Sequence, residues 1–255
     1  MLRSTFLHLP GVGPVTELAL WRDGVLDWRD LAGRADALGG SPSHRERIRQ
    51  ELRASERALE EGDAAWFGRR LPDAEHWRIF SEFRDRTGYL DIETTGLSPY
   101  AGMVTVVTVH GGGATRTFIA GEDLEELPAY LGKFPVLVTF NGRQFDVPFL
   151  EATFPALSAP PVHIDLRFVF YRLGLAGGLK RIEEQLGVGD RTGVEGIRGL
   201  DAVRLWREYR AGNPQSLDRL VRYNRADTVN LEPLLVRATT ELEQRLFGDR
   251  LPARS

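Results

Sequence analysis

The sequence predicts an α/β protein in which a mixed five-stranded sheet is flanked by helices and follows a small, all-helical region. Two observations predict this arrangement. Residues 1–86 show helical apolar spacing, whereas residues 87–240 alternate β-branched runs with amphipathic segments, which is typical of a sheet covered by helices. Of the 255 residues, 42% are hydrophobic and 27% are charged, which suffices for a sizeable core. Residues 241–255 are expected to form a C-terminal tail.

A glycine-rich turn near the N-terminus is the first candidate ligand site. Gly11 and Gly13 lie two residues apart, and Pro14 follows at an expected first helical position. Such a turn lets the backbone approach a ligand closely and points free N–H groups outward, so it suits a phosphate. A plain turn between two short helices is the alternative. After Gly24 stops the next helix, Asp27 is expected to cap another.

Two further helices are expected in the N-terminal region. Residues 43–66 carry apolar side chains near helical spacing and predict one helix. Helix breakers over 68–72 end it, and a shorter amphipathic helix is expected from Asp73. The apolar side of this second helix holds Trp77, Phe80 and Phe83.

Residues 88–97, Gly-Tyr-Leu-Asp-Ile-Glu-Thr-Thr-Gly-Leu, begin the expected sheet. Leu90 and Ile92 alternate with Asp91 and Glu93, so both carboxylates project from the same face of a strand. Like charges this close repel each other on a core-forming strand, and a divalent metal ion is the simplest compensation. A solvated strand edge that ends in a Thr-Thr-Gly turn is the alternative.

Four more strands are expected. The β-branched run 103–110 and its partner 115–120 should join the first strand as an antiparallel meander, before a helix over 123–131. The continuous apolar strand 134–140 then implies a βαβ crossover. The fifth strand and the later helices are expected at 162–165, 166–173, 178–186, 199–210 and from Pro214.

Two polar patterns follow the later elements. Asp146 comes just beyond the C-terminal end of the fourth strand, where open α/β sheets place their ligands, although a helix N-cap or a surface acid is the alternative. Tyr223 and Asp227 are four residues apart and therefore share one face of the last helix. Taken singly, the latter two would be a satisfied hydrogen-bond pair.

Taken together and in this order, the three motifs resemble the DEDD exonucleases of the ribonuclease-H-like fold, in the subgroup with Tyr in the third motif. The runs Leu-Asp-Ile-Glu-Thr-Thr-Gly-Leu, Phe-Asn-Gly-Arg-Gln-Phe-Asp-Val-Pro-Phe-Leu and Tyr-Asn-Arg-Ala-Asp-Thr-Val-Asn-Leu also resemble the YprB-type ribonuclease-H-like proteins, over residues 5 to about 235. The N-terminal turn resembles a helix-hairpin-helix motif, in which a Gly-Val-Gly turn between two short helices grips a nucleic-acid backbone.

The resemblance implies a 3'-5' exonuclease that hydrolyses phosphodiester bonds with two divalent metal ions, Mn²⁺ or Mg²⁺, and releases nucleoside 5'-monophosphates. By resemblance, Asp91 would bridge both ions, Glu93 and Asp227 would complete the first site, and Asp146 would hold the second. Tyr223 would orient the attacking water, because a phenol with an unperturbed pKa of about 10 is a poor general base. The chain has no cysteine, so oxygen and imidazole ligands remain, which favours a hard cation.

The remaining candidates would contact the substrate. They are Thr94, Thr95, Asn141, Lys180, Gly11 and Gly13, and for each a structural role in a turn or cap is the alternative. His163 and Asp165 are expected to be a strand end and a helix N-cap rather than metal ligands.

Single-stranded DNA or a DNA 3' end is the expected partner, because the hairpin resembles DNA-repair modules and the DEDD site needs a frayed 3' end. A 3'-5' exoribonuclease is the first alternative, and a non-catalytic nucleic-acid-binding protein is the second. The intact set of acids argues against the second. No protein partner is inferred. No apolar run approaches the length of a membrane span and no signal-peptide pattern precedes Pro10, so a cytoplasmic location without membrane association is expected.

The charge balance indicates little for the whole chain. It carries 33 basic and 36 acidic residues, for a formal net charge of -3. The stretch from Arg191 to Arg225, however, contains eight arginines and four acids. This arginine-rich stretch is either a solvated helical face or a track that contacts phosphates.

Overall fold

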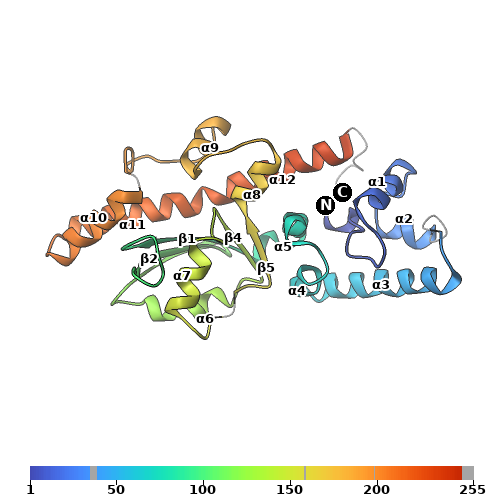
Figure 1. Cartoon of the computed structure of the whole chain (residues 1–255), viewed down its shortest axis with the longest axis horizontal. Helices are drawn as coiled ribbons and strands as arrows, with labels where there is room; N and C mark the ends of the chain where they lie inside the picture. The colour runs from blue at the N-terminus through green and yellow to red at the C-terminus, as the bar shows by residue number, and fades with distance from the viewer. Residues whose placement is uncertain (35–38, 158, 198, 249–255) are drawn as a thin grey trace. The chain divides into compact units, whose positions relative to one another are not determined.

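The computed structural model describes residues 1–34, 39–157, 159–197 and 199–248. The chain forms two compact units (Figure 1): one holds Met1–Arg84 and the C-terminal segment from Thr239, and the other holds Asp85–Ala238. None of the described helices combines the length and the apolar character that crossing a bilayer requires.

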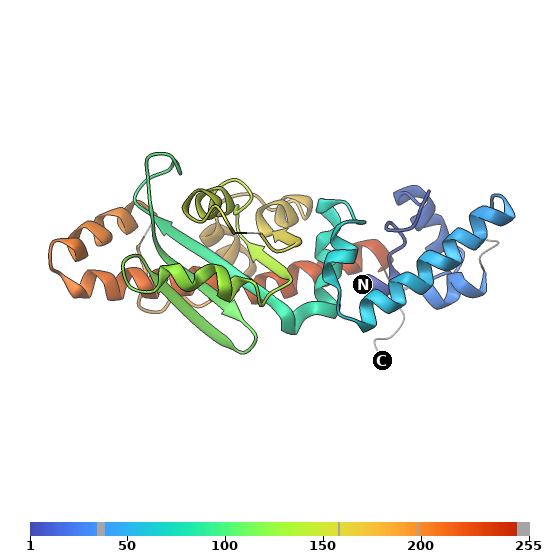
Figure 2. The same cartoon turned by 90° about the horizontal axis from the view of Figure 1, so that it is seen from below.

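The described residues of the first unit form helices and 3-10 turns, with the long α3 lying along one side of this unit (Figure 2). Its elements up to residue 84 are η1 (Leu2–Ser4), α1 (Pro14–Arg22), α2 (Trp28–Gly33), α3 (Pro42–Glu60), α4 (Ala64–Gly68), η3 (Asp73–Ile79) and α5 (Phe80–Phe83). Aromatic rings fill its centre, where Trp28 stacks on Phe67 with ring centroids 5.9 Å apart. A buried ion pair joins α1 to η3, because Arg78 Nη1 lies 2.8 Å from Glu17 Oε2.

Two predictions for this unit are wrong in detail. The expected helix over 43–66 is two helices, because α3 ends at Glu60 and Gly62 adopts a left-handed φ of 69°. Asp63 then caps α4 by accepting a hydrogen bond from the Trp66 N–H at 2.9 Å. The segment expected to be helical from Asp73 begins as the 3-10 helix η3 and becomes α-helical at Phe80.

The glycine turn is also built differently from the predicted hairpin. Pro14 does begin α1 and Asp27 does cap α2, as predicted. The helical element before the turn, however, is only the three-residue 3-10 turn η1, so Gly11 and Gly13 do not lie between two α-helices. Gly11 has a left-handed φ of 77°, which favours glycine at this position.

The second unit contains the predicted mixed five-stranded sheet, in the order β3-β2-β1-β4-β5. Strand β1 (Thr87–Thr94) pairs antiparallel with β2 (Val104–Gly111), and β2 pairs antiparallel with β3 (Ala114–Ile119). On its other side β1 runs parallel to β4 (Val136–Thr139), which runs parallel to β5 (Val162–Asp165). The short element η4 (Arg84–Arg86) leads into β1. The remaining elements are η5 (Leu124–Glu126), α6 (Leu127–Leu131), α7 (Asp146–Thr153), α8 (Leu166–Arg172), α9 (Leu179–Leu186), α10 (Gly199–Arg210), α11 (Pro214–Val229) and α12 (Leu231–Phe247), whose residues from Thr239 belong to the first unit.

Helices cover both faces of the sheet. Helices α6 and α7 lie against one face and α10 and α11 against the other (Figures 1 and 2). Leu90 and Ile92 of β1 belong to the core on the α6 and α7 side. Because side chains alternate along a strand, Asp91 and Glu93 project toward α11 instead.

Helix α12 continues through residue 240 to Phe247, so the predicted tail from residue 241 begins inside a helix. The Phe247 ring contacts Trp21 of the same unit, with centroids 4.5 Å apart. The rest of the expected tail, residues 249–255, lies outside the described residues.

Candidate active site

Strand β1 places two carboxylates on the face of the sheet that α11 covers. Asp91 and Glu93 stand on either side of the buried Ile92. The pairing with β2 shifts register between Glu93 and Thr94, so the ladder is irregular at the end of the strand, as it is at a β-bulge. Bulges are common beside active sites because they redirect side chains.

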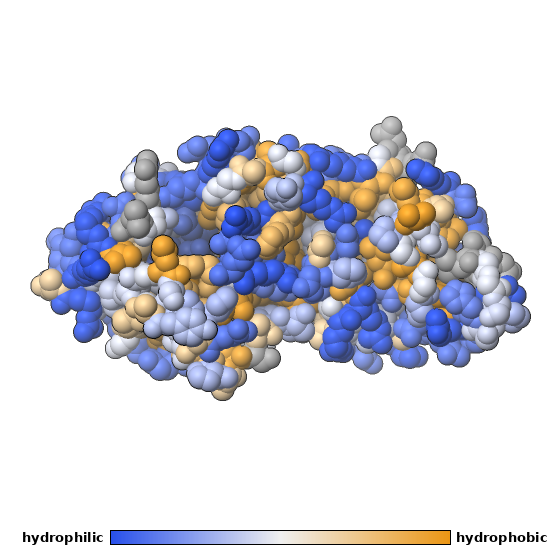
Figure 3. Space-filling view, viewed as in Figure 1, coloured by the Kyte–Doolittle hydropathy of each residue, from blue (hydrophilic) through white to orange (hydrophobic). Residues whose placement is uncertain are grey.

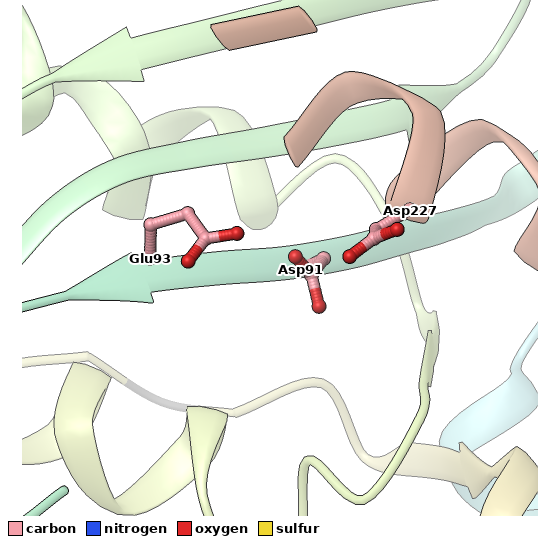
Figure 4. Close-up of side chains that lie close together, drawn as sticks. All are labelled: Asp91, Glu93 and Asp227. Atoms are coloured by element: carbon pink, nitrogen blue, oxygen red, sulfur yellow. The ribbon is translucent and has the colours of Figure 1, made fainter. Parts of the chain in front are cut away.

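Helix α11 brings a third carboxylate to the same place. Figure 4 shows Asp227 on this helix facing Asp91 and Glu93 on the strand. One oxygen of each of the three carboxylates lies within 4.8 Å of those of the other two. These three residues form what we call the acid cluster.

Asn224 fixes one member of the acid cluster. Its side-chain Nδ2 donates to Asp91 Oδ2 at 2.8 Å, and the Asn224 side chain is fully buried. The Asn224 Oδ1 atom is buried and has no hydrogen-bond partner among the described residues. A buried amide of this kind holds the carboxylate in one orientation. The sequence offered a signal for it, since Asn224 lies three residues before Asp227 and therefore on the same helix face.

Asp146 joins the acid cluster in one pocket. It is the first residue of α7 and only 3% exposed. A pocket of about 730 Å³, which we call the acid pocket, is lined by all three members of the acid cluster and by Asp146 and Tyr223. The Asp146 carboxylate does not belong to the group whose oxygens lie within 4.8 Å of one another. Of the four predicted acids, three therefore form the acid cluster and Asp146 lines the same pocket beside them.

The loop that delivers Asp146 is tightly constrained. Gly142 has no room for a side chain, because a Cβ there would lie 2.3 Å from Thr139 Oγ1. Asn141 has a left-handed φ of 68°, and its backbone N–H donates to Asp165 at 2.7 Å. Asp165 also caps α8 by accepting from the Arg167 N–H, which confirms its predicted role as an N-cap.

Burial and the repulsion of neighbouring carboxylates hold Asp91, Glu93 and Asp146 toward their protonated forms. Burial, followed by the charges of Asp227 and Asp146, raises the pKa of both Asp91 and Glu93. Burial, together with the nearby Asp165 charge, raises the pKa of Asp146 to about 7. A cation among these carboxylates would relieve both effects.

The donors in this pocket fit a hard divalent cation. Several carboxylate oxygens converge from three elements, and Mg²⁺ and Mn²⁺ prefer such ligands. The acid cluster would hold one ion, and Asp146 with Asp91 would hold a second.

A model of the RNase_H superfamily matches residues 88–239. The chain belongs to the RNase_H superfamily. The matched residues include the whole acid cluster together with Asp146, Tyr223 and all but the first residue of the five-stranded sheet.

Solved structures with similar folds are more distant. The family B DNA polymerase from the hyperthermophilic archaeon Pyrobaculum calidifontis is 20% identical, over 59% of this chain and 24% of the polymerase, with a TM-score of 0.47. The chain therefore corresponds to about a quarter of that polymerase. The Aedes aegypti Nibbler EXO domain is 9% identical over 68% of this chain and 89% of its own, with a TM-score of 0.42. Brucella melitensis NrnC with bound Mg²⁺ is 21% identical over 69% of this chain and 93% of the NrnC chain, with a TM-score of 0.34. No curated protein sequence matches the chain.

In this RNase_H-superfamily chain, Tyr223 lies beside Asp227 as predicted. Burial, followed by the charge of Asp227, raises the pKa of its phenol further above the ordinary value. Tyr223 is therefore protonated at neutral pH and can donate a hydrogen bond. Lys180 lies against its ring, with Nζ 4.6 Å from the centroid, and Nζ also donates to the Ile197 carbonyl. A contact between Lys180 and phosphate stays a prediction.

Arg191, which the sequence marks only as the first member of the arginine-rich stretch, contacts the acid cluster. Its Nη1 donates to Asp227 Oδ1 at 2.5 Å, and its Nε donates to Glu183 of α9. Burial opposes the charge of this guanidinium, but the attraction of Asp227 prevails and its pKa is raised. The loop that carries it has no apolar periodicity, so no local pattern predicts this contact.

The other residues predicted to contact the substrate are divided between the two compact units. Asn141 lines the acid pocket, and so do Thr94 and Thr95. The Thr95 N–H, however, donates to the Met103 carbonyl at 3.0 Å and is already used within the loop. Any contact of Thr95 with a nucleotide would rest on another atom. Gly11 and Gly13 belong to the other compact unit, and their contact with phosphate stays a prediction.

Most of the described arginine side chains in the arginine-rich stretch are exposed. Figure 3 shows mainly hydrophilic side chains over α10 and α11. Arg204 pairs with Asp201 and Glu208, and Arg198 lies outside the described residues. The exposed members are Arg204, Arg207, Arg210, Arg219, Arg222 and Arg225. Contact of this stretch with phosphates stays a prediction.

Proposed function

We propose that this protein is a divalent-metal-dependent 3'-5' exonuclease that hydrolyses single-stranded DNA and releases nucleoside 5'-monophosphates. The observation that carries the proposal is the single pocket lined by Asp91, Glu93, Asp146, Tyr223 and Asp227. Membership of the RNase_H superfamily supports it. The 3'-5' direction rests on the resemblance of the three motifs to DEDD exonucleases. The DNA substrate rests on the resemblance of the N-terminal glycine turn to DNA-repair modules and on the frayed 3' end that a DEDD site needs.

The residues of the acid pocket have different proposed roles in the reaction. Divalent ions, when bound, would supply an activated water nucleophile and neutralise charge on the phosphate. The acid cluster and Asp146 would hold them, and Asn224 keeps Asp91 oriented. Because Tyr223 keeps its proton at neutral pH, we assign it the positioning of the attacking water rather than the removal of a proton.

The pocket volume favours an unpaired end over a duplex. A cavity of about 730 Å³ lies within the range of pockets that hold small molecules, so it suits a terminal nucleotide. A DNA 3' end would have to leave its duplex to reach the acids. A role in DNA repair or nucleic-acid turnover would follow from this chemistry.

The test is digestion of matched 5'-labelled single-stranded DNA and RNA oligonucleotides with Mn²⁺ or Mg²⁺. We expect a ladder that shortens from the 3' end of DNA, and Asp146→Asn should abolish it while leaving DNA binding nearly unchanged. The matched control is Glu151→Gln, which removes an exposed acid from the same helix α7 and should retain cleavage. Degradation of RNA alone would replace the DNA substrate with RNA. Binding without cleavage of either would overturn the enzymatic proposal.

A further inference from the structure

A second hollow adjoins the acid pocket within the same unit. It has a volume of about 810 Å³ and is bounded by the end of β4, by α8 and by the start of α9. We call it the α8 pocket. Phe140 and Asn141 line both hollows, so the two share a wall.

The shared wall is held in place by hydrogen bonds. Arg167 Nη1 donates to Asn141 Oδ1 at 2.5 Å and to Gln144 Oε1 at 3.3 Å. These bonds tie α8 to the loop that follows β4. A nucleic-acid strand that leaves the acid pocket past Asn141 would therefore meet the Arg167 guanidinium next.

Two aromatic rings of α8 stand exposed at the α8 pocket. Phe168 is 47% exposed and Tyr171 is 76% exposed, whereas Phe170 on the inner side of the helix is 1% exposed. Phe168 and Tyr171 are three residues apart and therefore neighbours on one helix face. Exposed rings of this size forgo the free energy that burial of their apolar surface would give.

The charge of the α8 pocket suits a polyanion. Arg167 is cationic, and the described residues that line this pocket include no carboxylate. The acid pocket on the other side of the wall has the opposite character. Exposed aromatic rings beside a guanidinium are how proteins bind unpaired nucleotides, since every base can stack on a ring while the cation meets the backbone.

We propose that the α8 pocket binds the unpaired nucleotides that precede the terminal one. Their bases stack on Phe168 and Tyr171, and a backbone phosphate meets Arg167. This inference rests on the proposed function, because it takes the terminal nucleotide to occupy the acid pocket. The ligand class is single-stranded nucleic acid, and binding should strengthen as the strand lengthens beyond one nucleotide.

The experiment measures binding of fluorescent oligothymidylates of increasing length to the inactive Asp146→Asn protein in Mn²⁺. Tyr171→Ser should weaken binding of the longer strands about tenfold, the size of one lost base stack, and leave thymidine 5'-monophosphate binding unchanged. Tyr171→Phe keeps the ring and should bind like the parent. Arg167→Gln should lower the salt dependence by about one phosphate contact, whereas Arg167→Lys should retain it.

The outcomes separate this proposal from the proposed function. Equal binding of long strands by Tyr171→Ser and the parent would overturn the α8 pocket as a nucleotide site, even if the wild-type protein degrades DNA. A tenfold loss of binding in Tyr171→Ser, together with no cleavage of the oligonucleotides by the wild-type protein, would support the pocket and overturn the exonuclease. Equal weakening of the mononucleotide and the long strands would also overturn a separate subsite.

Discussion

Arg191 donates a hydrogen bond to Asp227 Oδ1 at 2.5 Å, and so places a guanidinium beside the acid cluster. The same guanidinium also donates to Glu183 on α9. A fixed cation and a divalent ion would both compete for the Asp227 carboxylate. We therefore expect Arg191 to weaken the binding of a metal ion in this pocket.

Replacing Arg191 tests this competition. Arg191→Gln should bind Mn²⁺ more tightly, by roughly tenfold, because a like charge next to the ion is removed. Isothermal titration calorimetry with Mn²⁺ measures the change. The matched control is Arg204→Gln, which breaks exposed ion pairs on α10 and should leave the affinity unchanged. Weaker Mn²⁺ binding by Arg191→Gln would show that Arg191 supports the metal site instead.

Metal binding should stabilise the native protein. Because the carboxylates of the acid cluster repel one another without a cation, saturating Mn²⁺ should raise the thermal midpoint at neutral pH. A Mn²⁺ concentration of about 100 times Kd corresponds to about 2.7 kcal/mol of added stability. Differential scanning calorimetry with Mn²⁺ and with EDTA gives the shift. No shift would contradict a formed metal site, and Asp91→Asn should reduce it.

Without metal, Asp146 should make the native state less stable as the pH rises. Its pKa is raised from an unfolded value of 3.8 to about 7, so the native state holds a proton that the unfolded state loses. The stabilising contribution is complete below pH 3.8 and disappears as the pH rises to about 7, with a slope of about 1.4 kcal/mol per pH unit. Urea unfolding in EDTA across this range measures it. Asp146→Asn should flatten the slope, and an unchanged slope would count against the raised pKa.

His8 of the first unit should have the opposite effect on stability. Burial, followed by the charge of Arg70, lowers its pKa from 6.5 to about 3. The unfolded state therefore binds a proton that the native state refuses, and native stability falls as the pH drops from 6.5 toward 3, by about 1.4 kcal/mol per unit. His8→Phe, which keeps a ring among Trp28 and Phe67, should remove this acid sensitivity. His44→Asn on α3 is the control and should keep it.

Asn224 should be required for turnover although it is not a metal ligand. Asn224→Ala frees the Asp91 carboxylate, which Nδ2 holds at 2.8 Å, and should lower activity or metal affinity by about 10- to 100-fold. Single-turnover digestion and Mn²⁺ titration of the same variant separate the two effects. Activity and affinity both equal to the wild type would show that Asp91 needs no such support.

The sheet was predictable because its strands carry clear sequence patterns. The β-branched run in β2 and the alternation in β1 predicted both the pairing and the common face of Asp91 and Glu93. Helix limits were less predictable. The apolar spacing of α3 carries on into α4, and only the left-handed conformation of Gly62 separates them.

The candidate site was predictable where its residues share an element with a periodic pattern. Asp227 and Tyr223 share a helix face, and that spacing is visible in the sequence. Arg191 reaches Asp227 from an irregular loop, and the α8 pocket depends on which faces of α8 remain uncovered. Both are decided by tertiary packing, which a single sequence does not encode locally.

The hydrogen bond between Asn224 and Asp91 joins residues 133 positions apart in the chain. Closing so long a loop lowers the entropy of the chain before the contacts that it allows can stabilise the fold. The packing of α11 against β1 should therefore come late in folding. The acid cluster would then assemble only in the last steps of the folding reaction. A divalent ion added during refolding should consequently leave the folding rate unchanged and slow unfolding instead.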